Sequence, residues 1–285
     1  MSTDVAFATC RELPEPDWDA QPLAKAVQQR GLTSAEAAWD DPGVAWGDFR
    51  LVVLRSTWNY YLHHEDFLRW VEATASVATM HNPPAVVCWN THKRYLIELA
   101  EKGIAVVPTE YVPTGANASL AELLARRDWQ RAVVKPAVSA ASHMTFAMTA
   151  ASSSDQTQFN ALCSERDMLV QPFVASVTGY GERSVVVIDG EISHAVRKSP
   201  RFGGEDESVK GPLDISQAEA DLALSALEAI SPPHEGPLLY ARVDMAPDES
   251  GAPMLMELEL TEPSLFFDKG PGSAAKFASA IAARL

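Results

Sequence analysis

Short apolar runs and amphipathic stretches alternate through the first third of the chain. Val5–Ala8 and Leu51–Leu54 are apolar runs bounded by polar residues, and each predicts a buried strand. A helix is expected at Pro22–Arg30, and another at His64–Val77, where apolar residues recur at helical spacing (Phe67, Leu68, Val71 and Ala75). Strands that alternate with helices predict an α/β layer with parallel strands.

The middle of the chain continues the alternation with shorter elements. Asn90 suits the N-cap and Gly103 the C′ position of a helix at Thr91–Lys102, and Ile104–Val107 follows as a short predicted strand. We then expect a helix, a strand, a loop of small residues and another strand, in that order (Leu120–Ala125, Arg131–Lys135, Pro136–Ser142 and Leu169–Val174).

The last third predicts a hairpin and a final pair of strands. Asp189-Gly190, between strands at Ser184–Ile188 and Ile192–Val196, is a strong hairpin signal. Ser199–Pro212 is polar and rich in glycine, and we expect a mobile loop there. The remaining elements are a helix, two strands and a closing helix (Gln217–Ile230, Leu239–Met245, Met254–Leu260 and Ser273–Leu285).

Composition narrows the class of protein. The 285 residues are 47% hydrophobic and carry a net charge of −15, with no basic stripe of the kind that nucleic-acid binding needs. We find neither a signal peptide nor an apolar run long enough to span a membrane. Cys10, Cys88 and Cys163 are far apart and predict reduced thiols. We therefore expect a cytoplasmic protein with no nucleic-acid or membrane partner, and the oligomeric state, a homodimer included, stays open.

Three carboxylates on the final pair of strands suggest a metal site. Glu257 and Glu259 lie two apart, so they share one face of their strand, and Asp244 lies beside them if the two strands pair. Carboxylates this close repel one another unless cations lie between them, and carboxylate oxygen is a ligand that Mg²⁺ prefers. A merely solvated face is the alternative, but the leucines around the carboxylates do not alternate as an exposed strand would (Leu255, Leu258 and Leu260).

Two lysines are candidates for binding phosphate. Lys135 ends a predicted strand just before the small-residue loop, and Lys93 falls in the first turn of the predicted Thr91–Lys102 helix. An ammonium group beside the free N–H groups of such a loop suits a phosphate. For each lysine taken alone, a plain surface charge is the alternative interpretation.

The next strand and the start of the hairpin offer contacts for a nucleotide. Gln171, Phe173 and Val174 end a strand at a domain junction, where backbone groups and apolar side chains suit an adenine, although a buried strand end is an equal interpretation. Glu182 suits a ribose hydroxyl or faces water.

Arg55 and Ser56 follow the strongest N-terminal strand. Ligands of open α/β sheets bind beyond the carboxyl ends of the strands, so Arg55 suits a substrate carboxylate, with a salt bridge as the alternative. His143 and His194 have no partner at the spacing of a metal site or catalytic triad, and we interpret both as structural.

Taken together, the motifs of residues 90 to 270 resemble the ATP-grasp superfamily, which includes glutathione synthetase and D-alanine–D-alanine ligase. More narrowly, Val133-Val-Lys-Pro-Ala-Val138, Tyr240-Ala-Arg-Val-Asp244 and Met256-Glu-Leu-Glu-Leu-Thr-Glu-Pro-Ser-Leu265 look like the branch that contains the cyclo-ligase of cycloserine biosynthesis. The resemblance implies an α/β (α+β) ATP-grasp fold with an N-terminal α/β pre-ATP-grasp domain. We expect three parts: 1–105 on the substrate side, 106–174 with the lid loop, and 175–285 with the metal site.

The resemblance also implies roles for the matching residues. ATP would be held at its phosphates by two lysines, at adenine by three hinge residues and at ribose by Glu182 (Lys93, Lys135, Gln171, Phe173 and Val174). Arg242 and Lys93 would be catalytic, and Asp244, Glu257 and Glu259 would bind two Mg²⁺, for which Mn²⁺ can substitute. Many relatives have a glycine-rich lid, whereas this chain has Ser139-Ala-Ala-Ser142, which adopts positive φ only at a cost and leaves the lid conformation open.

The implied activity is ATP-dependent C–N ligation through an acyl phosphate, with release of ADP. The substrate would be a small amino-acid-like carboxylate that reacts with an amine, with cyclisation of O-ureido-D-serine to D-cycloserine as one candidate. An ATP-grasp ligase that joins amino acids or dipeptides shares every ATP residue and remains an alternative. A non-catalytic nucleotide-binding module is a third interpretation, which the full set of lysines and carboxylates disfavours.

Overall fold

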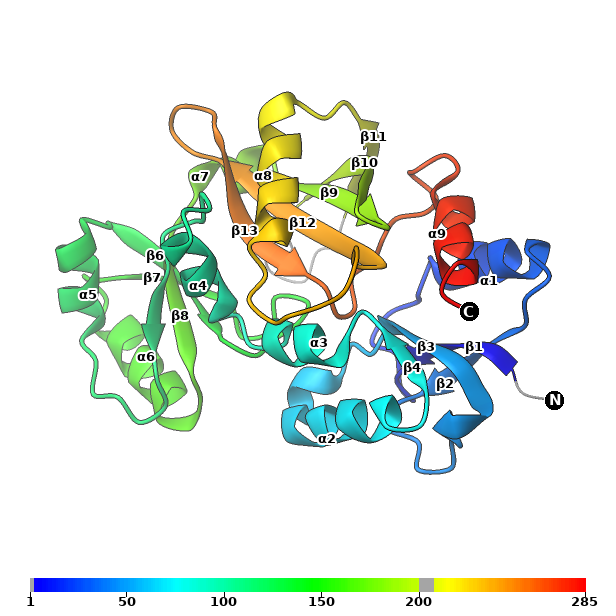
Figure 1. The fold of residues 1–285 in the computed structure, drawn as a ribbon. Coiled ribbons are helices and arrows are strands. Elements are labelled where there is room, and N and C mark those ends of the chain that lie inside the picture. The colour runs from blue at the N-terminus through cyan, green and yellow to red at the C-terminus, as the bar shows by residue number, and fades with distance from the viewer. Residues whose placement is uncertain (1–2, 200–207) are drawn as a thin grey trace.

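Three β-sheets with their covering helices make up the computed structural model, which describes residues 3–199 and 208–285 (Figure 1). The first sheet is parallel, with strand order β2-β1-β3-β4, and the other two are antiparallel. Within the described chain, no helix has the length and apolar character needed to cross a bilayer.

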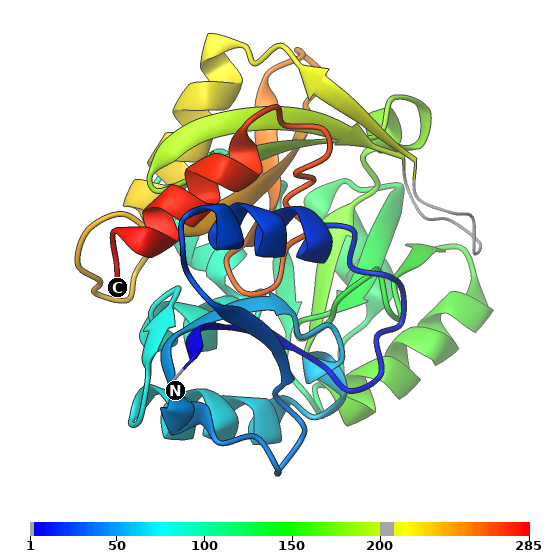
Figure 2. The ribbon, with the colours of Figure 1, turned by 90° about the vertical axis from the view of Figure 1, so that its right-hand side faces the viewer.

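The N-terminal sheet is buried on both faces, as a parallel sheet usually is. Its elements run β1 (Thr3–Thr9), α1 (Ala20–Gln29), β2 (Ser34–Ala38), β3 (Phe49–Ser56), α2 (His64–Ala75) and β4 (Thr79–His81), with short 3-10 turns at Trp46–Asp48 and Tyr60–Leu62. Leu51 and Val53 of β3 pack toward α1 and the C-terminal helix α9 (Ser273–Ala282), whereas Val52 and Leu54 pack toward α2. Helices α1 and α9, from opposite ends of the sequence, therefore lie side by side (Figure 2).

The second sheet, in the order β5-β8-β6-β7, has one face covered by two helices. Two further short helices precede it: α3 (Pro84–Asn90) and α4 (Tyr95–Glu101). Its elements are β5 (Glu110–Val112), α5 (Leu120–Arg127), β6 (Arg131–Pro136), β7 (Phe146–Thr149), α6 (Ser153–Glu165) and β8 (Met168–Pro172). Apolar residues of α5 and α6 fill the core against β6 and β8.

The third sheet, in the order β11-β10-β9-β12-β13, has one apolar face, and its other face carries charged residues beside apolar ones that pack against α9. After the short helix α7 (Ala175–Gly179), its elements are β9 (Glu182–Ile188), β10 (Glu191–Lys198), β11 (Val209–Leu213), α8 (Gln217–Glu228), β12 (Tyr240–Pro247) and β13 (Pro253–Glu259). Val185 and Val243 pack in the core that α4 and α8 cover, so Arg242 and Asp244, the neighbours of Val243, lie on the other face. The predicted hairpin is confirmed, because β9 pairs with β10 and Asp189 and Gly190 both have positive φ, at 55° and 75°.

The helix predicted at Thr91–Lys102 is confirmed from Tyr95 onward, because α4 covers Tyr95–Glu101 and Gly103 follows with a positive φ of 88°, as expected of a C′ residue; its predicted start is wrong. Asn90 ends α3, and Lys93 lies in the turn before α4. The Asn90 side chain caps no helix: it donates to the Leu258 carbonyl at 2.7 Å and accepts from Leu260 N–H at 2.9 Å. Tertiary bonding to β13 therefore displaces the expected cap.

Three other boundaries differ from the prediction. Ile104–Val107 is not a strand: Val106 forms an isolated bridge to Leu255, and the pairing stops before Pro108, which has no N–H to donate. The strand expected at Leu169–Val174 ends at Pro172, because α7 follows at once. Of the loop expected at Ser199–Pro212, residues 200–207 lie outside the described residues, whereas Val209–Leu213 forms β11.

Two buried asparagines fasten the third sheet to the segment around α3. Asn82 donates to the carbonyls of Tyr240 and Leu260 at 2.9 and 2.7 Å. Asn90 makes matching bonds to the Leu258 carbonyl and the Leu260 N–H, at the end of β13. Buried backbone groups need such partners, so these amides fix where β12 begins and where β13 ends.

Replacing Asn90 by Ala should lower the free energy of unfolding by about 2–4 kcal/mol, because it leaves the Leu258 carbonyl and the Leu260 N–H buried without partners. Urea unfolding measures the effect. Asn117→Ala, at an exposed position, is the matched control and should change stability by less than about 0.5 kcal/mol. Equal stabilities of the two variants would contradict the role of Asn90.

Candidate active site

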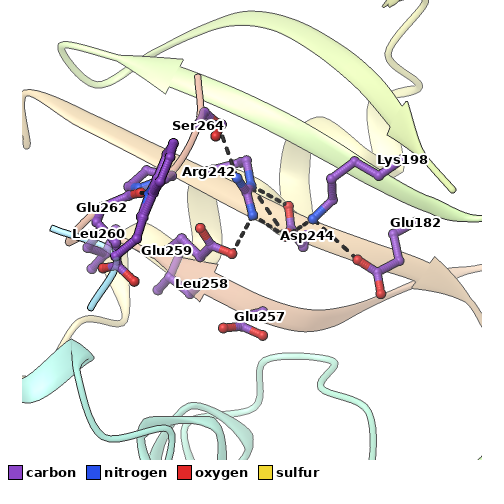
Figure 3. Close-up of polar contacts among 12 residues, drawn as sticks. Glu182, Lys198, Arg242, Asp244, Glu257, Leu258, Glu259, Leu260, Glu262 and Ser264 are labelled. Carbon is purple, nitrogen blue, oxygen red and sulfur yellow. Dashed lines mark hydrogen bonds and ion pairs between the residues drawn. The ribbon is translucent and has the colours of Figure 1, made fainter. Parts of the chain in front are cut away.

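The three predicted carboxylates lie together on β12 and β13 (Figure 3). Asp244 pairs directly with Glu257, and Arg242 pairs with Glu259. The register shifts after Asp244, so that Met245 faces Leu255 and Met256 is the extra residue of a bulge. This bulge explains why the leucines of β13 do not alternate strictly.

Asp244 is fully paired by two cations. Arg242 Nε lies 3.0 Å and Lys198 Nζ 2.7 Å from its carboxylate oxygens. Burial alone would raise the pKa of Asp244, but the charges of Arg242 and then Lys198 outweigh it and hold that pKa below its usual range. Asp244 is therefore ionised despite being 2% exposed.

Glu257 receives the two lysines that the sequence singled out. Its carboxylate lies 3.0 Å from Lys93 Nζ and 3.7 Å from Lys135 Nζ. Burial would raise the pKa of Glu257, but the two ammonium groups lower it below its usual range. Burial also lowers the pKa of Lys135, with Glu257 acting in the opposite direction. The turn before α4 and the end of β6 thus meet at one carboxylate.

Carboxyl groups outnumber cations at the other end of the row. Glu259 forms an ion pair with Arg242, yet burial, together with the charges of Asp244 and Glu257, raises its pKa to about 7. Burial and then the Glu259 charge raise the pKa of Glu262 to about 8. A bound cation would relieve this excess, so the residues suit a divalent metal.

The same carboxylates are held by protein cations rather than arranged around a vacant centre. Among the residues that the structure describes, no three His, Cys, Asp or Glu side chains are grouped as they would be around a metal ion. To bind a metal, the carboxylates would have to give up some of the side-chain cations that now pair with them. Phosphate groups could then serve as new partners for those lysines and for Arg242.

Lys198 is a site residue that the sequence analysis missed. It is buried at the end of β10, and its ammonium joins Asp244 to Glu182, which lies 3.3 Å away. Regular pairing outward from the Asp189-Gly190 turn would bring Lys198 opposite Gly181; a register shift between Ile192 and His194, which the sequence does not reveal, brings it opposite Glu182 instead.

The predicted adenine residues lie at the end of β8. Gln171 is buried and donates to the Thr109 hydroxyl at 2.9 Å. The Phe173 ring lies under the Arg131 guanidinium, with 4.0 Å between Cζ and the ring centroid, and Val174 directly precedes α7. All three border the step from the second sheet to the third.

Arg55 and Ser56 are not brought to the carboxylate cluster. Arg55 is 3% exposed, lies 3.4 Å from the Asp19 carboxylate and donates to the Pro263 carbonyl at 3.0 Å. Ser56 donates to the Thr9 hydroxyl at 2.9 Å. Arg55 therefore forms a salt bridge, the alternative that the sequence analysis left open, and its bond to Pro263 helps to hold the segment after β13.

The loop predicted as a lid contacts both the site and the N-terminal sheet. Lys93 donates its N–H to the Ala137 carbonyl at 2.7 Å and its ammonium to the Ser139 carbonyl. Ala141 and Ser142 have positive φ, 49° and 57°, despite lacking the freedom of glycine. Non-glycine residues therefore hold this loop in a conformation that costs backbone energy.

Three comparisons with known proteins match this chain to the same family. Residues 5–82 match the family model of the N-terminal domain of D-cycloserine synthetase DcsG. The chain is 34% identical over 283 residues to the cycloserine biosynthesis protein DcsG of Streptomyces lavendulae, covering 94% of each protein. The crystal structure of D-cycloserine synthetase DcsG matches with a TM-score of 0.90 and 30% identity, over 98% of this chain and 99% of that one.

A more distant match shares the fold. The ATP-grasp ligase PsnB, in a complex with a precursor variant, Mg and ADP, has a TM-score of 0.65 and 17% identity, over 99% of this chain and 98% of that one. The ATP-grasp fold class predicted from the sequence is therefore confirmed. The chain belongs to the D-cycloserine synthetase DcsG family and has the fold of the ATP-grasp ligases.

Proposed function

We propose that this chain is an ATP-dependent ligase that forms a C–N bond from a small carboxylate substrate through an acyl phosphate. One observation carries the proposal: Glu257, in the row of carboxylates on β12 and β13, directly faces lysines from two other segments, Lys93 and Lys135. Buried carboxylates beside buried lysines suit ATP with its metal ions. The phosphates are negative and would pair with the lysines, and the metal ions are positive and would pair with the carboxylates.

The nucleotide would lie between the parts 106–174 and 175–285, a division that we propose for the chain. Lys93 and Lys135 would contact its phosphates, and Glu182 its ribose. Gln171, Phe173 and Val174 would surround the adenine. The position of the three hinge residues, beside the step between the second and third sheets, supports this arrangement.

Asp244, Glu257 and Glu259 would hold two Mg²⁺ ions, for which Mn²⁺ would substitute. Bound there, the ions neutralise phosphate charge during phosphoryl transfer. The excess of carboxyl groups around Glu259 supports this fit. Arg242, which already contacts both Asp244 and Glu259, would stabilise the charge that develops on the reacting groups.

The ligation has two steps, and with O-ureido-D-serine a third, in which water removes the carbamoyl group from the attacking nitrogen as carbon dioxide and ammonia. A substrate carboxylate oxygen attacks the γ-phosphorus, and ADP leaves. A nitrogen then attacks the acyl carbon and loses a proton, and inorganic phosphate leaves. No covalent bond to the enzyme is needed, so the side chains only bind, orient and neutralise charge.

We propose O-ureido-D-serine, cyclised to D-cycloserine, as the substrate, and the cytoplasm as the place of reaction. The likeness to D-cycloserine synthetase over nearly the whole chain supports this choice. Ligases of amino acids or dipeptides share the nucleotide residues, so the substrate must be tested directly.

A substrate panel tests the proposal. The protein with ATP and Mg²⁺ is offered O-ureido-D-serine, single amino acids or dipeptides, and ADP and new products are followed by chromatography. We expect ADP and D-cycloserine in equal amounts with O-ureido-D-serine alone. Release of ADP with amino acids or dipeptides instead would indicate a different ligase. Absence of ADP with every compound would favour a nucleotide-binding module.

Glu257→Gln should reduce kcat by about 100-fold or more, because it removes a charge needed by metal-bound nucleotide and by both lysines. Steady-state ADP release at saturating Mg²⁺ measures the change. Glu191→Gln, on the exposed end of β10, is the control and should keep wild-type activity. A near wild-type rate for folded Glu257→Gln would contradict the metal assignment.

A further inference from the structure

Glu262, just beyond β13, is held in place by its backbone rather than by its side chain. Three consecutive carbonyls accept hydrogen bonds from buried or half-buried side chains: Thr261 O from Tyr240 Oη at 2.7 Å, Glu262 O from Trp58 Nε1 at 2.9 Å, and Pro263 O from Arg55 Nη2 at 3.0 Å. Two of these donors come from the N-terminal part of the chain, Arg55 from β3 and Trp58 from just after it, so this part orients the residue. A group fixed in this way before ligand binding loses little freedom on binding.

The Glu262 carboxylate has no cationic partner in the described part of the chain. It makes no hydrogen bond or ion pair with any residue in 3–199 or 208–285. The nearest positive charges are engaged elsewhere, since Lys93 pairs with Glu257 at 3.0 Å and Arg242 pairs with Asp244 and Glu259. A half-buried carboxylate without a partner is costly, and a cationic ligand would remove that cost.

The position of Glu262 in the row separates it from the nucleotide. In Figure 3 the charged side chains run from Glu182 through Lys198, Asp244, Arg242 and Glu259 to Glu262. Glu182, the proposed ribose contact, stands at one end, so Glu262 stands at the end where the substrate would lie. The Trp58 contact places the same end against the N-terminal part.

The chemistry of a single carboxylate favours an ammonium ion over another metal. Mg²⁺ prefers several oxygen ligands in octahedral geometry, whereas one carboxylate is sufficient to pair with an ammonium group. We propose that Glu262 binds the α-ammonium group of an amino-acid substrate. The inference rests on the proposed function and deepens it, because it names the side chain that recognises the α-ammonium group of the substrate. The substrate carboxylate would then point back toward Arg242 and the phosphates.

The test compares O-ureido-D-serine with the same compound lacking its α-amino group, in wild type and in Glu262→Gln. For the amino-acid substrate, Glu262→Gln should lower kcat/KM about 100-fold. For the deaminated compound, both proteins should have the same low kcat/KM within about twofold, because no ammonium is left to bind. The KM for ATP should stay unchanged, and Asp268→Asn, an exposed carboxylate in the same segment, is the matched control.

Each other outcome has a distinct meaning. If Glu262→Gln lowers kcat/KM equally for both compounds, or for neither, Glu262 does not bind the ammonium and the inference is overturned while the proposed function stands. If wild-type protein releases no ADP with either compound, the proposed function fails, and the inference falls with it. Circular dichroism and thermal unfolding confirm that the variant is folded.

Discussion

Buried negative charge on one face of β12 and β13 is the constraint on which the rest of the structure depends. Carboxylates can stay ionised there only when cations reach them. Those cations come from separate places: Lys93 from the turn before α4, Lys135 from β6, and Lys198 from β10. The positions of these three segments are thereby coupled to the same charges. When ATP binds with Mg²⁺, the lysines would pair with phosphates and the carboxylates with Mg²⁺, so that neither set of charges would be left unpaired.

A neutral framework holds the charged face in position. Asn82 and Asn90 bind the ends of β12 and β13 through backbone groups, and the Tyr95 hydroxyl accepts from Leu258 N–H at 3.0 Å. Behind the segment that follows β13, the Asp19 carboxylate accepts backbone N–H groups from residues 265 to 267. The geometry of the site therefore depends on hydrogen bonds between segments far apart in sequence, and not on the strands alone.

Features set by local pattern were predictable from the sequence, and features set by tertiary contacts were not. Alternation placed Asp244 beside Glu257, and the Asp-Gly turn gave the β9–β10 hairpin. The Thr91–Lys102 helix was predicted to start too early, because Asn90 bonds to another strand instead of capping the helix, which no local rule reveals. Short or polar elements were missed for lack of periodicity, among them β2, β4, β5, β7, α3, α6 and α7. The burial of Arg55 could not be predicted either, because its partners, Asp19 and Pro263, are far from it in sequence.

Transfer of oxygen from the substrate to phosphate tests the central claim most directly. With ¹⁸O in the substrate carboxylate, the account predicts one labelled oxygen in the released phosphate and ADP as the nucleotide product, because the carboxylate oxygen attacks phosphorus and leaves with it. Mass spectrometry of the phosphate measures the label. Label confined to the organic product, or formation of AMP and pyrophosphate, would contradict an acyl phosphate at this site.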